Sequence, residues 1–176
     1  MKWTPEERAH LELLERWRTA MNLVGPGPAE DHFIDAAGAV DGLAAEGQWA
    51  DLGSGAGFPG VALAARHPGA QVTLVESRQK RALFLGQVIR AAGLTNVTIF
   101  HGRTENLEPG FDGVISRAYR PPLEYLQDAD RLLRADGVAV LLTGDEMAPV
   151  EGWVQRESHR YPATDGFRTR TVLARA

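Results

Sequence analysis

The residues with the clearest chemical potential are an acid and three glycines near position 50. Asp51 follows the short apolar run 48–50, and a glycine-rich turn separates it from the alanine-rich stretch 61–66. The glycines of the turn are Gly53, Gly55 and Gly57. We expect a buried strand, a tight turn and a helix, which together let a ligand approach bare backbone at a helix N-terminus. The stretch predicts a nucleotide-type site, with a glycine-rich turn that binds nothing as the alternative.

Two acids help to decide which nucleotide would bind. Residues 55–60 satisfy the G-x-G-x-x-G pattern of dinucleotide-binding folds, so NAD has to be considered. Asp51, however, lies two residues before the first glycine, where a carboxylate repels a pyrophosphate and suits an ammonium group. Glu76 ends the next apolar run, 72–75, and can accept hydrogen bonds from both hydroxyls of a ribose. The D-x-G-x-G-x-G spacing is typical of class I methyltransferases, and S-adenosylmethionine is therefore favoured over NAD.

Length and composition limit what the chain can be. With 176 residues, 44% hydrophobic and 24% charged, it predicts one domain, residues 1–176, in which residues 1–46 form a helical N-terminal extension. The absence of cysteine excludes disulfides and thiolate metal sites and fits a cytoplasmic protein. The five histidines lack metal-ligand spacing, so we expect no metal. No apolar run is long enough to span a bilayer, and the net charge of −4 indicates no overall basic surface.

Helix and strand signals alternate around the glycine turn. A capping box at residues 4–7 starts a first helix, whose apolar stripe contains Leu11, Leu14, Trp17 and Met21. A second helix is expected over residues 29–45. Further strands are predicted at 71–75, 97–100, 111–116 and 138–143, helices at 78–92 and 121–133, and a terminal hairpin at 152–161 and 168–174. The order predicts a Rossmann-like α/β fold with a doubly wound, mostly parallel sheet, an antiparallel terminal hairpin and a small N-terminal helical cap.

The carboxyl ends of the predicted strands hold the remaining candidates, because ligands of open parallel sheets bind there. The third and fourth strands are followed by residues 102–105 and 116–118. Glu105, or the backbone beside it, is placed to contact an adenine; alternatively it is an exposed acid that opens a helix. Arg117 directly follows an apolar strand and can hold a cofactor carboxylate or an incoming phosphate. Its alternative is an ion pair with Glu76 or Glu105.

Several motifs together resemble one bacterial family. The glycine turn ends in Gly57-Phe58-Pro59-Gly60, and the next strand is followed by Glu76-Ser77-x-x-Lys80-Arg81. Further matches are Gly102-Arg103-Thr104-Glu105, Ser116-Arg117-Ala118, Trp17-x-x-x-Met21-Asn22-Leu23 and His32-Phe33-Ile34-Asp35. These motifs occur in the same order in the RsmG (GidB) family, which the chain resembles from about residue 14 to residue 142. Members of that family methylate N7 of a guanine, guanine 527, in 16S ribosomal RNA.

The resemblance implies roles for individual residues. S-adenosylmethionine would be bound by Gly53, Gly55, Gly57, Phe58, Thr104, Glu105 and Arg117, supported by Asp51 and Glu76. RNA would contact Lys80, Arg81 and Arg120, and Arg117 would be the one candidate for a catalytic role. The implied partner is 16S rRNA or the small ribosomal subunit, and the implied state is a monomer. Guanine N7 has a lone pair and no proton, so methyl transfer would require positioning and no general base.

The chain differs from the family at positions that would face RNA. Thr143 stands where the family's L-K-G motif has lysine, and Asp31 stands where the residue before His32 is usually basic. Each lost phosphate contact weakens RNA binding. Two alternatives therefore stand beside rRNA methylation. One is a diverged methyltransferase that acts on another RNA or on a small molecule, and the other is a non-catalytic module that binds the cofactor or RNA.

Overall fold

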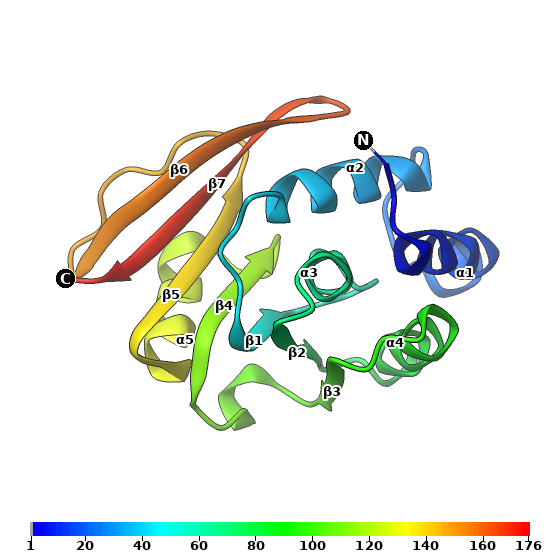
Figure 1. The fold of residues 1–176 in the computed structure, drawn as a ribbon, viewed down its shortest axis with the longest axis horizontal. Helices are drawn as coiled ribbons and strands as arrows, with labels where there is room; N and C mark the ends of the chain where they lie inside the picture. Colours follow the sequence, from blue (N-terminus) through cyan, green and yellow to red (C-terminus); the bar gives the residue numbers. More distant parts are fainter. Residues whose placement is uncertain (1) are drawn as a thin grey trace.

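The computed structural model describes residues 2–176. They form one seven-stranded sheet, with the strand order β3-β2-β1-β4-β5-β7-β6, and the helices that pack on it (Figure 1). The strands are β1 (Gly47–Leu52), β2 (Ala70–Glu76), β3 (Val97–His101), β4 (Phe111–Arg117), β5 (Leu133–Thr143), β6 (Trp153–Ala163) and β7 (Gly166–Arg175). The first five pair in parallel, while β7 is antiparallel to β5 and β6 is antiparallel to β7. The predicted mostly parallel sheet with a terminal antiparallel hairpin is confirmed.

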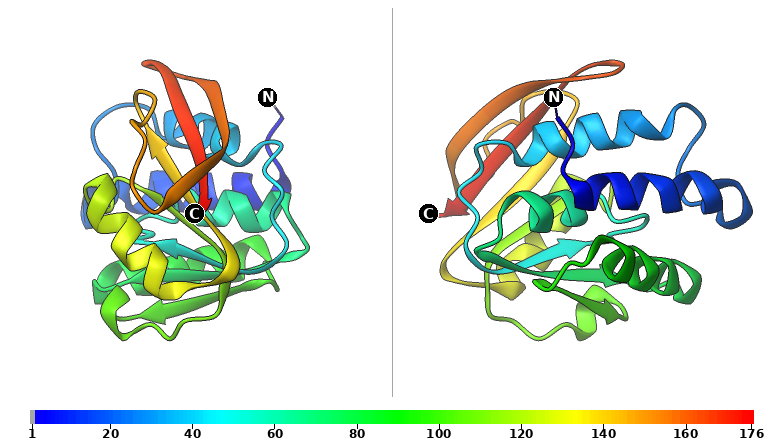
Figure 2. Two further views of the ribbon diagram at one scale, coloured as in Figure 1. Left: turned by 90° about the vertical axis from the view of Figure 1, so that its left-hand side faces the viewer. Right: turned by 45° about the vertical axis from the view of Figure 1, so that its right-hand side comes forward.

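Helices cover both faces of the sheet. They are α1 (Pro5–Met21), α2 (Ala29–Val40), α3 (Gly60–Arg66), α4 (Gln79–Ala92) and α5 (Pro122–Leu132), with a short 3-10 helix η1 (Thr104–Asn106). In Figure 2, α1 and α2 lie side by side, and α2 also packs against the β6–β7 hairpin, which forms the edge of the sheet opposite to β3. Within residues 2–176, no helix is both long and apolar enough to cross a membrane.

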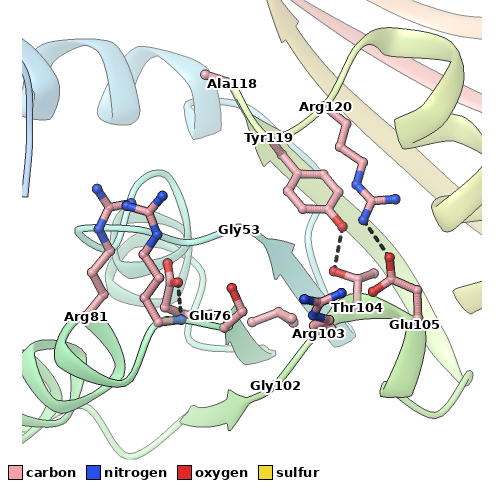
Figure 3. A pocket seen from close by; sticks show the side chains of 13 residues that line it. Gly53, Glu76, Arg81, Gly102, Arg103, Thr104, Glu105, Ala118, Tyr119 and Arg120 are labelled. Atoms are coloured by element: carbon pink, nitrogen blue, oxygen red, sulfur yellow. Dashed lines mark hydrogen bonds and ion pairs between the residues drawn. The ribbon is translucent and has the colours of Figure 1, made fainter.

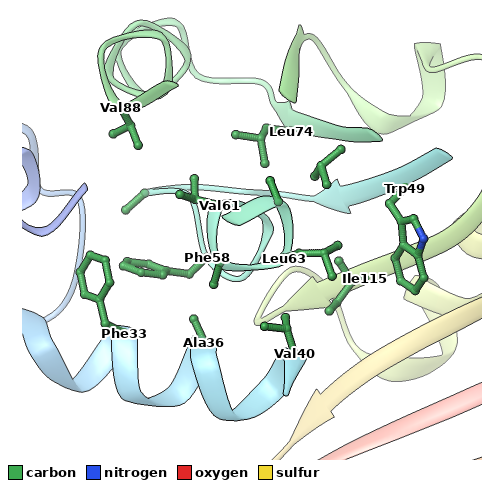
Figure 4. Close-up of a cluster of buried hydrophobic side chains, with 14 of the residues drawn as sticks. Phe33, Ala36, Val40, Trp49, Phe58, Val61, Leu63, Leu74, Val88 and Ile115 are labelled. Atoms are coloured by element: carbon green, nitrogen blue, oxygen red, sulfur yellow. The ribbon is translucent and has the colours of Figure 1, made fainter. Parts of the chain in front are cut away.

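Alternation along the strands builds two hydrophobic clusters, because successive side chains of a strand point to opposite faces. Ile115 of β4 packs in the cluster shared by α1, α2, α3 and α4, which Figure 4 shows around Phe33, Phe58 and Leu63. Its neighbour Val114 packs in the cluster formed with α5. The N-terminal helices therefore belong to the same core as the helix that follows the glycine turn.

Three details differ from the sequence-based expectations. The second helix ends at Val40 instead of residue 45, because Asp41 leaves the helical conformation with ψ of 127° and Gly42 has φ of +68°. Trp17 of the predicted apolar stripe is 42% exposed, so it lies outside the core. The fifth strand starts at Leu133, because the pairing with β4 shifts register between Phe111 and Gly113 and accommodates residues 134–137 within the strand.

The predicted capping box of α1 also ties this helix to α3. Thr4 N donates to Glu7 Oε2 at 2.9 Å, and Glu7 N donates to Thr4 Oγ1 at 3.2 Å. Glu7 is 1% exposed, and both of its oxygens accept hydrogen bonds from Arg66, at 2.6 Å from Nε and 2.8 Å from Nη2. One carboxylate therefore caps the first turn of α1 and fixes its position against α3.

We expect Glu7→Ala to lower the free energy of unfolding by about 2–3 kcal/mol, because it leaves the Arg66 guanidinium without its carboxylate partner in a mostly buried position. Urea unfolding measures this loss. The matched control is Glu15→Ala on the same helix, where the ion pair with Arg18 is exposed and a change of less than about 0.5 kcal/mol is expected. Equal losses in the two variants would contradict the anchoring role of Glu7.

Candidate functional site

A cavity of about 430 Å³ opens at the carboxyl ends of the parallel strands (Figure 3). Its walls come from the glycine turn after β1, from Glu76 and Arg81, from residues 102–105 after β3 and from residues 118–120 after β4. The strand order reverses between β1 and β4, and ligands of open α/β sheets bind at such a switch point. We call this space the first cavity.

The glycine turn gives the first cavity its backbone wall. Gly53 has φ of +69°, and a Cβ built on it would lie 2.5 Å from Cδ2 of Tyr119. Gly57 has φ of +102°, and its Cβ would lie 2.8 Å from Val61 Cγ2 and 3.0 Å from His10 Cε1. Gly55 has φ of +57°, but its nearest neighbour would be Arg81 Nη1 at 3.6 Å. Gly53 is thus required for the shape of the cavity, and Gly57 for packing beneath it.

Glu76 connects the turn with the end of β2. Its Oε2 accepts a hydrogen bond from Gly55 N at 3.0 Å, and its Oε1 accepts one from Arg78 N at 2.7 Å. The residue is buried and still lines the first cavity. Since each carboxylate oxygen has two acceptor positions, Glu76 can order the turn and accept further hydrogen bonds from a ligand.

Asp51 lies beneath the turn and is absent from the residues that line the first cavity. It is fully buried, and its Oδ2 accepts a hydrogen bond from Gly60 N at 3.0 Å, at the start of α3. Among the described residues, its Oδ1 has no hydrogen-bond partner. Burial raises the pKa of Asp51 to about 7. The carboxyl group shapes the turn, and its predicted attraction for an ammonium group stays a prediction.

The wall opposite the turn is a side-chain network that the sequence did not indicate in full. Tyr119 lies with its hydroxyl 2.7 Å from Thr104 Oγ1 and 3.2 Å from Asp128 Oδ2. Arg120 pairs with Glu105 at 2.6 Å and with Asp128 at 3.2 Å. Pairing raises the pKa of Arg120 and lowers that of Glu105. Tyr119 was missed, although an aromatic residue directly after a strand-end motif is a usable signal.

Arg117 and Phe58 lie apart from this network. Arg117 lines a second cavity of about 390 Å³, and its Nη1 donates to Asp35 Oδ2 at 2.7 Å. The ion pair proposed with Glu76 or Glu105 is therefore wrong in its partner. Phe58 is buried, with the Arg117 guanidinium 5.0 Å from its ring centroid. The two cavities share Ala118.

The three residues predicted to contact RNA lie in different surroundings. Arg81 and Arg120 line the first cavity, and Arg81 also donates to the carbonyl oxygen of Asn22 at 3.3 Å. Lys80 is exposed in the first turn of α4 and lines neither cavity. Thr143, one of the departures from the family pattern, lines the second cavity. Contact of these side chains with RNA stays a prediction.

His10 of α1 supports the turn from the core, a role that sequence reasoning missed. Its Nε2 donates to the carbonyl oxygen of Ala56 at 2.7 Å, and its ring stacks on Phe58 with centroids 4.9 Å apart. Burial lowers the pKa of His10 to about 4. The neutral ring therefore holds the glycine turn through one hydrogen bond and one aromatic contact.

The pKa of His10 predicts acid sensitivity. Above about pH 6.5 the ring is neutral in the folded and unfolded chains; between pH 6.5 and 4 only the unfolded chain binds the proton, so stability falls with pH. From pH 7 to 4.5 we expect the wild type to lose about 2 kcal/mol more than His10→Gln in urea unfolding. His101→Gln, at an exposed histidine, should retain the wild-type pH dependence. The same pH dependence in His10→Gln would contradict the assignment.

The sheet order, the glycine turn and the acid at the end of β2 define a class I, Rossmann-like methyltransferase fold. A family model described as GidB, rRNA small subunit methyltransferase G, matches residues 6–159. The chain belongs to this family. Within residues 2–176, no group of three or more histidine, aspartate and glutamate side chains is arranged to hold a metal ion.

Individual relatives agree with this assignment. The ribosomal RNA small subunit methyltransferase G of Stenotrophomonas maltophilia is 35% identical over 159 residues, which cover 84% of this chain and 74% of the relative. The protein of the same name from Xanthomonas oryzae is 34% identical over 180 residues, 95% of this chain and 84% of the relative. An O-methyltransferase of Bacillus cereus, solved in complex with SAH, has a TM-score of 0.63 at 16% identity and covers 96% of this chain and 91% of its own. At that identity the similarity shows the fold.

Proposed function

We propose that this chain transfers a methyl group from S-adenosylmethionine to N7 of a guanine in 16S rRNA, guanine 527 being the family target. Membership of the rRNA small subunit methyltransferase G family makes the chain an S-adenosylmethionine-dependent rRNA methyltransferase. The observation that carries the proposal is the first cavity, where the glycine turn and Glu76 meet at the switch point of the sheet.

The residues of the first cavity fit this cofactor. Gly53 leaves room that a Cβ would fill, and Glu76 offers carboxylate oxygens for the ribose hydroxyls. Thr104 and Glu105, with the backbone beside them, would contact the adenine. When bound, the cofactor supplies a methyl group on a positively charged sulfur. Four arginines line the same cavity as Glu76 and Glu105, so the fit rests on the space at Gly53 and on the hydrogen-bond acceptors of Glu76.

The chain's own contribution is positioning. Guanine N7 carries a lone pair and no proton, so no side chain has to remove one. The walls of the cavity must orient the two reactants and exclude water, and alignment of this kind contributes up to about 7–11 kcal/mol in favourable cases. His10, Asp51 and Glu76 hold the turn from below and from the side, which fixes the backbone wall before the ligands arrive.

The family name identifies the substrate as rRNA of the small ribosomal subunit, and a more specific partner can be proposed. We propose that the substrate is the rRNA within the small ribosomal subunit, and that the protein acts as a monomer in the cytoplasm. Arg81 and Arg120 at the rim of the first cavity, together with the exposed Lys80, would meet the RNA backbone. These contacts rest on the family's substrate and on the basic side chains at this end of the sheet.

The test is methyl transfer from labelled S-adenosylmethionine to small ribosomal subunits from cells that lack the gene. We expect about one methyl group per 16S rRNA, at N7 of a single guanine, located by chemical cleavage at 7-methylguanine. Label in another base or only in another RNA or a small molecule would support a diverged methyltransferase. Binding of S-adenosylhomocysteine without transfer would support a non-catalytic module.

A further inference from the structure

The second cavity is distinct from the first cavity, and the two adjoin at Ala118, which lines both. Its walls come from α2, from the carboxyl ends of β4 and β5, and from β7. The side chains that matter here are His32, Asp35, Arg117, Leu142, Thr143 and Arg168. A ligand in this space would lie beside a ligand in the first cavity, because Ala118 lines both.

Two guanidinium groups face the second cavity. Asp35 is buried and holds Arg117, and it also accepts a hydrogen bond from the Tyr161 hydroxyl at 3.0 Å. Asp35 is thus a positioning residue for Arg117. Arg168 donates from Nη2 to the exposed Asp165 at 2.9 Å. Within residues 2–176, each of the two arginines is held through one terminal nitrogen, and the rest of each fork can bind phosphate oxygens.

The same cavity also offers a surface for a flat ring. His32 is half-buried, and its imidazole stacks on Phe58 with centroids 5.7 Å apart and ring planes 28° from parallel. Burial lowers the pKa of His32, which favours the neutral form of its ring. Leu142 contributes an apolar wall. Unstacked nucleobases bind to aromatic and apolar surfaces of this kind.

We propose that the second cavity seats the methyl-accepting nucleotide, a purine nucleotide from an unpaired RNA segment. The base lies against His32 and Leu142, and the neighbouring phosphates contact Arg117 and Arg168. The inference rests on the proposed function and adds the place and the chemistry of acceptor recognition. A cavity of about 390 Å³ accepts one unpaired nucleotide and excludes a duplex.

The first test compares two arginines of the same hairpin. Arg168→Ala removes a positive charge from the second cavity. The control, Arg160→Ala, removes a positive charge from β6. Arg160 lines neither cavity, and its guanidinium lies 4.3 Å from the Phe167 ring centroid. With small ribosomal subunits, we expect Arg168→Ala to lower kcat/KM at least tenfold and Arg160→Ala to change it less than twofold. Arg168→Lys should fall between Arg168→Ala and the wild type. Binding of S-adenosylhomocysteine should change less than twofold in all three.

The second test detects the acceptor directly. Guanosine 5′-monophosphate is titrated onto the complex with S-adenosylhomocysteine while backbone amide resonances are recorded. We expect shifts at Ala118, Thr143 and Gly144, and their loss in Arg168→Ala. Shifts confined to the first cavity, or no shifts, would overturn the inference. So would equal losses of kcat/KM in Arg168→Ala and Arg160→Ala. If the wild-type protein methylated no rRNA, the proposed function would be refuted instead. The amide shifts alone would then decide whether the second cavity binds the nucleotide.

Discussion

Gly53→Val should raise the Kd for S-adenosylhomocysteine at least 100-fold, measured by isothermal titration calorimetry. The new side chain would meet Tyr119, whose nearest ring carbon is 2.5 Å from the position of the Cβ. Tyr119 cannot move away without breaking its contacts with Thr104 and Asp128, which form the opposite wall of the first cavity. The variant therefore closes the space in which the cofactor is expected to lie.

A matched control separates this effect from backbone strain. Gly93 has φ of +65° at the end of α4, close to the +69° of Gly53, and a Cβ there would meet nothing within 4 Å. Gly93→Val should share the strain, about 1–2 kcal/mol or more for a β-branched residue, and should bind the cofactor product normally. Near-normal binding by Gly53→Val would show that the cofactor does not use the first cavity.

Glu76→Ala should weaken binding of S-adenosylhomocysteine by about 30-fold or more. The variant removes the expected acceptor of the ribose hydroxyls and also the acceptor of two backbone hydrogen bonds, from Gly55 N and Arg78 N. A hydrogen bond to a charged group contributes about 1.5–3 kcal/mol, and each 1.4 kcal/mol corresponds to a factor of ten. Calorimetry with the same ligand measures the loss.

Two further variants refine this result. Glu76→Gln retains the size and one acceptor oxygen and should lie between Glu76→Ala and the wild type. Glu108→Ala removes an exposed acid near η1 that lines neither cavity, and it should bind as the wild type does. If Glu76→Ala bound S-adenosylhomocysteine within threefold of the wild type, the ribose contact would have to be assigned elsewhere.

The parts that the sequence predicted are those whose determinants lie close together in the chain. The capping box at Thr4 and Glu7, the glycine turn and Glu76 are each encoded within a few residues of an element boundary. The alternation of strands and helices also predicted the parallel, doubly wound sheet, since short connections leave few topologies. The predicted ends of helices and strands were wrong where tertiary structure decides them, as at the end of α2 (Val40) and the start of β5 (Leu133).

The second cavity could not be predicted, because its residues come together only in the folded chain. Asp35 and Arg117 are 82 positions apart, and Tyr161 is 126 positions from Asp35. The sequence identified Arg117 as a residue in need of a partner and named two acids of neighbouring strand ends. The actual partner belongs to α2, which brings Asp35 to Arg117 at the carboxyl end of β4. Such pairings depend on helix docking, for which a single sequence has no local signal.

The most direct test of the central claim is a crystal structure with S-adenosylhomocysteine bound. We expect density for the adenosine part in the first cavity, between Glu76 and the wall formed by Thr104 and Tyr119, with the sulfur on the side of Ala118 that faces the second cavity. Density in another part of the molecule, or a sulfur turned away from Ala118, would contradict that claim.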